Sequence, residues 1–226
     1  MHFEVGDVFL KVVQQLTESQ ALTLRGSYYD EDSQVTYSGL TLAEWEDDPR
    51  GNPFKNDYMY ATHWATSATH QFDVNDGARL LTSAYYTHFN RDWWRQSSNS
   101  GQRPNDSSDP ACGGLANLNT TCGNEARLRQ YWTAGIEPRL NLQHTLFGVE
   151  NVLDTGLRYH QETQYRVQAN GDTPDARRPG TGRNAGIKED SDREVTAWSG
   201  FVQNRFDFGR FTVTPGLRFE HVDYLR

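Results

Sequence analysis

The chain has 226 residues and a formal net charge of -8, and it has no basic cluster, which argues against nucleic-acid binding. Its apolar fraction of 35% is low for a globular protein, but 11 Tyr, 11 Phe and 6 Trp exclude the aromatic-poor composition of a disordered chain. No apolar run is long enough for a transmembrane helix. This does not exclude a protein that crosses a membrane with β-strands, because each such strand carries only a weak hydropathy signal.

The first two predicted strands form a hairpin. Residues 4–15 and 21–31 alternate moderately, and the short polar link 16–20 joins them. A long connection rich in Asp, Gly and Pro follows at 33–55. After Gly39 this connection contains a segment for one or two helical turns, which Asp47-Asp48-Pro49 ends.

Residues 56–72 show the clearest period of two. One face collects aromatic residues near both ends and small residues between them: Tyr58, Tyr60, Thr62, Trp64, Thr66, Ala68, His70 and Phe72. This order is typical of two interfacial aromatic girdles around a lipid band. Residues 73–77 form a turn, and 78–91 return as a strand whose faces the sequence leaves unassigned.

The rest of the chain repeats the hairpin twice. A second long connection, about 92–126, precedes a strand at 126–140, a turn predicted at 141–144 and a return over 145–168. A third long connection, about 168–192, is charged and rich in glycine. It leads into the final hairpin, where Gly209 suits the positive φ of a tight turn.

The last strand separates apolar from polar residues strictly. Phe211, Val213, Leu217 and Phe219 fall on one face, whereas Arg218 and Glu220 fall on the other, where we expect them to pair in the interior. Short links and long polar connections alternate along the whole chain. Outer-membrane barrels have this alternation, because their periplasmic turns are short and their outer loops are long. The sequence therefore predicts an all-β fold, an antiparallel transmembrane β-barrel, with a soluble antiparallel barrel or sandwich as the alternative.

Two further features bear on the compartment. Cys112 and Cys122 lie in one polar segment without nearby His, which favours a loop-closing disulfide over a zinc site; two unpaired thiols are the alternative. The first residues lack the pattern of a signal peptide. We therefore expect either a cytosolic protein or an internal piece of a longer, exported one.

Two segments resemble a known family. Residues 200–224, GFVQNRFDFGRFTVTPGLRFEHVDY, are similar to the recurrent barrel hairpin of TonB-dependent outer-membrane receptors. Residues 36–57, TYSGLTLAEWEDDPRGNPFKND, resemble a loop of the ferric dicitrate branch of siderophore receptors. The resemblance implies an outer-membrane location and transport of a ferric chelate, ferric citrate or another siderophore. It also implies TonB as the energy-coupling partner, reached through a plug domain, and contacts with outer-membrane lipid and lipopolysaccharide.

The resemblance also defines what this sequence lacks. Receptors of the family close about 22 strands around a plug domain, whereas this sequence predicts about eight strands and no plug. We expect one third to one half of such a barrel. A piece of this kind has two open edges and is not competent alone, unless it closes on itself as an eight-stranded barrel.

For an anionic chelate, the resemblance directs attention to cations near the ends of the long connections. The candidate ligand-binding residues are Arg50, Lys55, Arg91, Arg95, Arg127 and Arg129. Pairing of these cations with lipopolysaccharide phosphates or interior acids is the plainer interpretation. Trp93 and Trp94 either cover a bound ligand or belong to an aromatic girdle at the membrane interface, and the girdle is the favoured interpretation.

No enzyme motif, metal-ligand spacing or cofactor site emerges from the sequence, so we expect a protein that is not an enzyme. Three functional hypotheses remain. The first is a barrel fragment of a ferric-chelate receptor. The second is an autonomous eight-stranded membrane barrel with a structural or adhesive role, and the third is a soluble ligand-binding β-barrel.

Overall fold

The computed structural model describes residues 2–35, 40, 42–51, 56–95, 125–173, 175–182 and 185–226. The described part contains the short helix α1 (Leu42–Asp47), which confirms the helical turn predicted after Gly39. The strands are β1 (Phe3–Thr17), β2 (Gln20–Ser33), β3 (Tyr58–Asn75), β4 (Ala78–Arg95), β5 (Glu125–Leu146), β6 (Val149–Asn170), β7 (Gly186–Asp207), β8 (Thr212–Val213) and β9 (Gly216–Leu225). Among these residues, no helical segment has the length and apolar character needed to traverse a bilayer.

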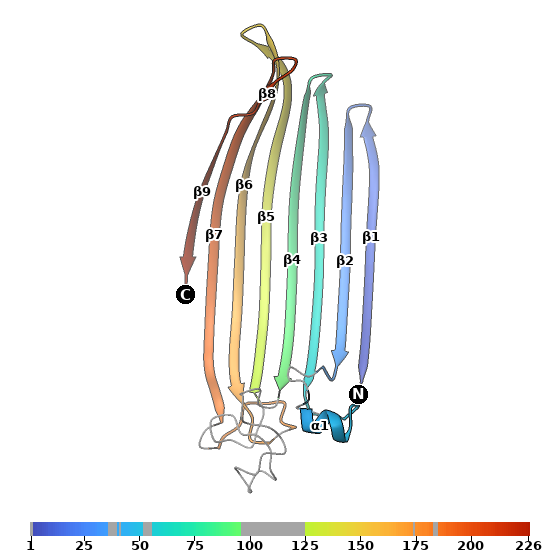
Figure 1. Cartoon of the computed structure of the whole chain (residues 1–226), viewed down its shortest axis with the longest axis vertical. Helices are drawn as coiled ribbons and strands as arrows, with labels where there is room; N and C mark the ends of the chain where they lie inside the picture. Colours follow the sequence, from blue (N-terminus) through green and yellow to red (C-terminus); the bar gives the residue numbers. More distant parts are fainter. Residues whose placement is uncertain are drawn as a thin grey trace.

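All the strands belong to one antiparallel sheet in which chain neighbours pair, and both β8 and β9 pair with β7 (Figure 1). Thr214 and Pro215 separate β8 from β9, because proline has no N–H to donate to the ladder. The Pro215 carbonyl still accepts the Asn204 N–H at 3.0 Å. The two short strands therefore form a single interrupted return from β7.

The sheet has two chemically different faces. We define the apolar face by the cross-strand row Tyr28, Trp64, His88 and Trp132, and the polar face by the alternate residues. On the hairpin side of this row, the apolar face continues with Leu24, Ala68, Ala84, Ile136, Tyr159 and Trp198. On the loop side it changes to Asp30, Thr62, Asn90, Gln130, Tyr165 and Asp192. The apolar band therefore ends at the aromatic row.

The apolar side chains of the last hairpin are exposed rather than packed in a dry core. Phe211 and Leu217 are each 73% exposed, and Phe219 is 63% exposed. Leu217 and Phe219 pair with Val202 and Gly200 on the apolar face. No second sheet covers these residues in the described part of the chain, so the structure disfavours a soluble sandwich.

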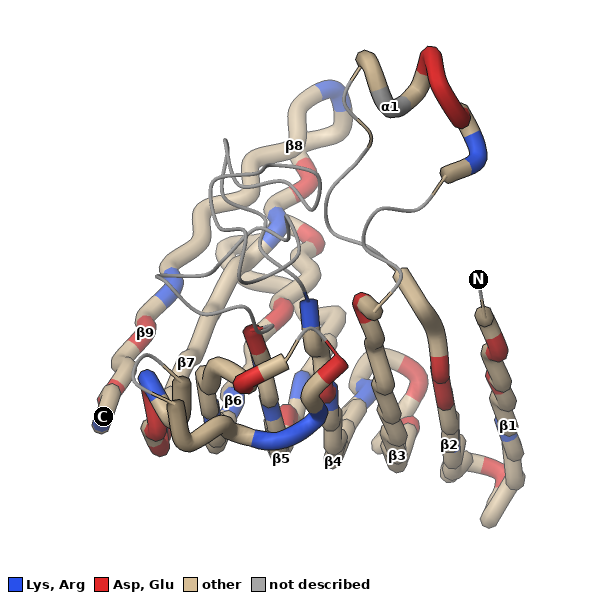
Figure 2. The backbone as a smooth tube through the Cα atoms, turned by 90° about the horizontal axis from the view of Figure 1, so that it is seen from below, with Lys and Arg blue, Asp and Glu red and all other residues tan. Residues whose placement is uncertain are grey.

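The sheet is curved and open. Seen from the loop end, the strands follow an arc from β1 to β9, and the two ends of the arc do not meet (Figure 2). Both edge strands are exposed along their whole length. The chain therefore does not close on itself as an eight-stranded barrel, and it has the shape of a barrel wall.

Three of the four predicted tight links are confirmed, and one is wrong. Residues 141–144 do not turn; β5 continues through them to Leu146. The chain instead reverses at Phe147 and Gly148, which have φ values of 55° and 76°, as a type I′ hairpin turn requires. Residues 141–144 looked like a turn because three of the four, Asn141, Gln143 and His144, are polar.

Gly135 on β5 makes room for an aromatic ring on the polar face. A Cβ at this position would overlap the Tyr85 hydroxyl and would lie 2.8 Å from the Tyr159 carbonyl oxygen. The Tyr85 hydroxyl in turn contacts His160 Nδ1 at 2.8 Å and accepts a hydrogen bond from Arg158 Nη2 at 2.8 Å. Tyr85 therefore lies over the backbone of β5 and links β4 to β6.

We predict that Gly135→Ala destabilises the fold by about 1–3 kcal/mol, because the added methyl group overpacks a site already filled by Tyr85. Urea-induced unfolding of the intact protein measures this change. Gly26→Ala is the matched control, since nothing lies within 4 Å of a Cβ at Gly26. Equal midpoints for the two variants would contradict the packing of Tyr85 over Gly135.

Candidate functional site: an arginine cluster on the polar face

Six arginines gather on the polar face where β4, β5, β6 and β7 approach the long connections. Four of them were predicted from the sequence. Cross-strand register places all six on the same face: Arg91, Arg95, Arg127, Arg129, Arg166 and Arg193. They lie at or beyond the level at which the opposite face changes from apolar to polar, because Arg91 lies between the outward residues Asn90 and Asp92.

Three of these arginines form a continuous row across adjacent strands. Arg91 pairs with Arg129, and Arg129 pairs with Arg166. Like charges directly opposite each other destabilise a sheet, so the row is costly for the empty protein. An arrangement that costs stability and concentrates donors suits a ligand of opposite charge.

Two carboxylates neutralise part of the cluster. Glu125 forms ion pairs with Arg127 and, at 3.3 Å, with Arg95. Glu189 pairs with Arg193 at 3.1 Å. On β4–β7 at this end of the polar face, six guanidinium groups therefore face two carboxylates, a surplus of four positive charges.

The arginines of the row have free donors. Arg91, Arg129 and Arg166 form no ion pair within the described residues. The Nε atoms of Arg91, Arg166 and Arg193 are buried there without a hydrogen-bond partner. Arg129 is 4% exposed and is fixed by two hydrogen bonds from its Nη1, to the Leu128 and Val167 carbonyls. Buried donors without partners are rare in proteins, and an added acceptor group could satisfy the Nε donors of Arg91 and Arg166.

Trp93 and Trp94 have different surroundings. Trp93 is on the polar face, where the guanidinium carbons of Arg91 and Arg95 lie 5.5 and 4.9 Å from its ring centre. Trp94 is on the apolar face and is 3% exposed in a small cluster with Ala126, Val167 and Ala169. From the sequence we predicted one common role for Trp93 and Trp94, whereas in the structure only Trp93 belongs to the arginine cluster.

The other sequence-predicted site residues lie apart from the cluster or outside the described residues. Arg50 is exposed in the turn after α1, where its N–H donates to Asp48 Oδ1 at 3.1 Å. Lys55, Cys112 and Cys122 lie outside the described residues. Their roles stay predictions.

Sequence reasoning missed Arg166, Arg193 and Glu189. Arg166 lay within a strand predicted to end at 168, and the other two lay at the start of the last strand or in the third connection. A signal for Arg166 exists in its even-numbered spacing from Arg158 and His160, which puts all three on the polar face of one strand. Its alignment with Arg129, however, depends on the β5–β6 register, which the wrongly placed turn concealed.

The connection between β6 and β7 is held by hydrogen bonds within itself and by contacts with the start of β3. The Asp172 carboxylate accepts hydrogen bonds from the Thr181 and Gly182 N–H groups, each at 2.8 Å. These bonds hold the pKa of Asp172 below its usual value. Arg177 reaches β3, with Nη2 2.9 Å from the Asn56 carbonyl oxygen and its guanidinium 5.0 Å from the centre of the Tyr58 ring. The connection thus spans the ends of β4 and β5 on the side of the apolar face.

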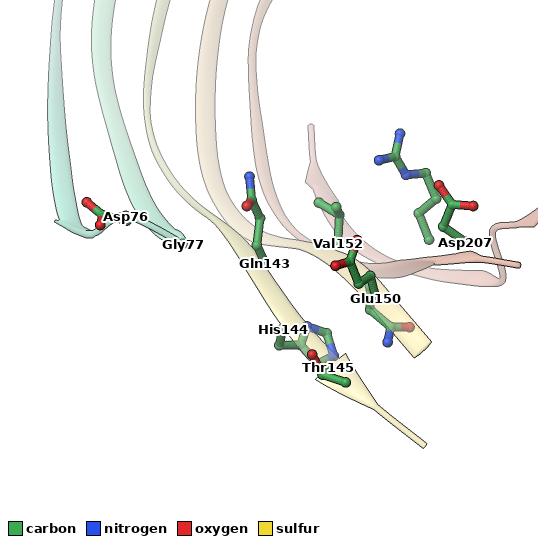
Figure 3. Close-up of a pocket in the computed structure, with 10 residues that line it drawn as sticks. Asp76, Gly77, Gln143, His144, Thr145, Glu150, Val152 and Asp207 are labelled. Carbon is green, nitrogen blue, oxygen red and sulfur yellow. The ribbon is translucent and has the colours of Figure 1, made fainter. Parts of the chain in front are cut away.

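A cavity of about 500 Å³ lies at the opposite, hairpin end of the sheet. Figure 3 shows its lining side chains, which come from the β3–β4 turn and from β5, β6 and β7. The cavity exists because the β5–β6 hairpin extends beyond its neighbour, since Ala78 at the β3–β4 turn already pairs with Leu142. No group of three His, Cys, Asp or Glu residues in the described chain could hold a metal ion there.

Comparison with known proteins adds two findings. A family profile described as "TonB dependent receptor-like, beta-barrel" matches residues 11–225. Among solved structures, the ferric citrate transporter FecA in its unliganded form is 20% identical over 98% of this chain and 30% of its own, with a TM-score of 0.77.

Two other solved structures are similar over the same region. The ferric-catecholate import receptor Fiu of E. coli K12, in its closed form, is 14% identical over 98% of this chain and 35% of its own, with a TM-score of 0.66. The ferric preacinetobactin receptor BauA of Acinetobacter baumannii is 10% identical over 99% and 34%, with a TM-score of 0.68. The chain therefore spans about a third of the length of these structures, and at these identities the likeness concerns the fold.

We predict that the Asp172 bonds protect the Thr181 and Gly182 amides from hydrogen exchange at neutral pH. Because the pKa of Asp172 is depressed in the folded protein, the stabilisation is present above the pKa of the unfolded chain and is lost as the pH falls through the folded pKa. Amide exchange of the intact protein measures it. Asp172→Ala should remove the protection at neutral pH, and unchanged protection in this variant would contradict the assignment.

Proposed function

Since the chain belongs to the TonB-dependent receptor β-barrel family, we propose that it forms part of the barrel of an outer-membrane receptor that takes up an anionic ferric chelate. TonB supplies the energy through a plug domain elsewhere in the receptor. Proteins of this family are outer-membrane receptors of Gram-negative bacteria and are not enzymes. The proposal assigns the apolar face to lipid and the polar face to the lumen.

The observation that carries the proposal is the arginine row on the lumen face. The cluster that contains the row has a surplus of four positive charges and lies at the end of the long connections, which face the outside in outer-membrane barrels. Guanidinium groups recognise carboxylates through paired, charge-assisted hydrogen bonds. A ferric complex held by carboxylate-bearing ligands matches this chemistry, because the chelator coordinates the iron and the protein needs to supply only cations.

Ferric citrate is the first candidate ligand. Citrate carries several carboxylates, and residues 36–57 resemble a loop of the ferric dicitrate branch. The similar FecA structure is described as a ferric citrate transporter. Lipid and lipopolysaccharide contact the outer wall in this proposal, with the aromatic row at the outer boundary of the hydrocarbon.

The open edges weigh against the autonomous eight-stranded membrane barrel. In hydrocarbon, every backbone N–H and C=O must be paired within the protein. In the described part of the chain, no further strand pairs with the outer edges of β1 and β9, which end the arc in Figure 2. An autonomous eight-stranded barrel requires these two strands to pair with each other, whereas a larger receptor barrel supplies other strands for both edges.

We predict that Arg166→Ala in the full-length receptor weakens ferric citrate binding roughly 10- to 100-fold, because it removes about 1.5–3 kcal/mol of charge-assisted hydrogen bonding. Isothermal titration calorimetry at two salt concentrations measures the loss, and the variant should also show a smaller salt dependence. Arg79→Ala is the matched control. Arg79 is on the same face but pairs with Asp73 near the hairpin end, about 40 Å along β4 from Arg91.

Two results would argue against the proposed function. One is a wild-type receptor with no measurable affinity for ferric citrate or any other anionic ferric chelate. The other is equal binding by the Arg166 and Arg79 variants, which would remove the arginine row from the ligand site.

A further inference from the structure

The two carboxylates of the arginine cluster are held in different ways. The Glu125 side chain is 7% exposed and contacts two arginines. The Glu189 side chain is 24% exposed, and among the described residues only one of its carboxylate oxygens has hydrogen-bond donors. Glu189 Oε1 accepts hydrogen bonds from Ser191 Oγ at 3.2 Å and from Arg193 Nη2 at 3.1 Å. Its Oε2 accepts none from the residues that the structure describes. Glu189 is therefore the carboxylate of the two that can move or be replaced.

Glu189 also lies next to the arginine row. On β7 the direct partner of Arg166 is Ser191, and the direct partner of Gln168 is Glu189. Glu189 and Arg166 are thus diagonal neighbours on one face, at a backbone separation of about 7–8 Å that long side chains bridge. Arg166 has no ion pair within the described residues, and its Nε is buried without a partner.

The charge balance shows what Glu189 does in the empty protein. Three arginines in register repel one another, and Glu189 offsets part of this repulsion without forming a direct pair with Arg129 or Arg166. A ligand carboxylate that enters the row meets the same guanidinium groups from the lumen. The ligand carboxylate therefore either stays close to Glu189 and is repelled by it, or takes the place of the Glu189 carboxylate beside the arginines.

We propose that Glu189 is the built-in counter-ion of the arginine row and determines how much negative charge a ligand must carry to bind. The inference rests on the proposed function and names a specificity-determining residue of that site. A ligand with several carboxylates binds in competition with Glu189, because its attraction to the arginines of the row exceeds its repulsion by the Glu189 carboxylate. A ligand with little or no charge gains nothing from the row while Glu189 is present.

Glu189→Gln tests the inference in the full-length receptor. The amide is isosteric, and its oxygen still accepts the hydrogen bonds from Ser191 and Arg193. Removal of one negative charge near a multiply charged anion should tighten ferric citrate binding roughly tenfold or more. Binding of an uncharged ferric hydroxamate should not change. Glu189→Asp, which keeps the charge, should resemble the wild type.

Glu162→Gln is the matched control. Glu162 is on the same face of β6, and its oxygens contact Gln164 and His160 rather than the arginine row. Its substitution should leave ferric citrate affinity within about twofold of the wild type. A Glu189→Gln receptor that binds ferric citrate no more tightly than the wild type, or that gains as little as the Glu162 variant, overturns the inference.

A second measurement separates failure of the inference from failure of the proposed function. Thermal unfolding is compared in chloride and in inorganic phosphate, which needs no knowledge of the natural ligand. The counter-ion role predicts that Glu189→Gln unfolds at a lower temperature than the wild type in dilute chloride and gains more from phosphate. If wild-type receptor fails to bind ferric citrate but this pattern is present, the chelate is wrong and the counter-ion role stands. If phosphate stabilises both proteins equally, the counter-ion role is wrong whatever the ligand.

Discussion

The fold depends on one requirement: backbone N–H and C=O groups in hydrocarbon must form hydrogen bonds with each other. A chain that crosses a bilayer as strands must satisfy each N–H and C=O group through its neighbours, because lipid offers no partners. Long strands paired in antiparallel register along most of their length meet this requirement. The same register fixes which side chains share a face, since direct partners across the ladder point to the same side. The lipid surface, the lumen surface and the arginine row are all consequences of that pairing.

The cost of the arginine row is visible in the way its members are held. Arg129 is buried and fixed by two backbone carbonyls, which orients it but leaves its charge unpaired within the described residues. Glu125 and Glu189 reduce the net charge without removing it. A cluster with this residual charge has the pre-organised donors that an anionic chelate needs. The iron itself requires no protein ligand, because the chelator coordinates it.

Much of the fold follows from local sequence, and the site follows only in part. The period of two in β3 predicted its apolar face, because the Tyr, Trp and Phe residues of this strand all fall on one side, with small residues between them. The faces of β4 could not be read, since Tyr85 and Tyr86 are adjacent and aromatic, and only the structure shows that Tyr85 fills the space over Gly135. Arg91, Arg95, Arg127 and Arg129 were found by their position near strand ends. Arg166 and Glu189 join them through long-range register, which a local pattern does not contain.

The central claim is that one face of these strands contacts lipid and the other lines the lumen. Spin labels at single cysteines introduced along β3 of the full-length receptor, at Thr66, Ser67, Ala68 and Thr69, test it most directly. Power saturation by oxygen, which concentrates in lipid, should alternate with a period of two, with maxima at positions 66 and 68. Equal oxygen accessibility at all four positions, or maxima at positions 67 and 69, would contradict the assignment of the faces and the placement of the arginine row in the lumen.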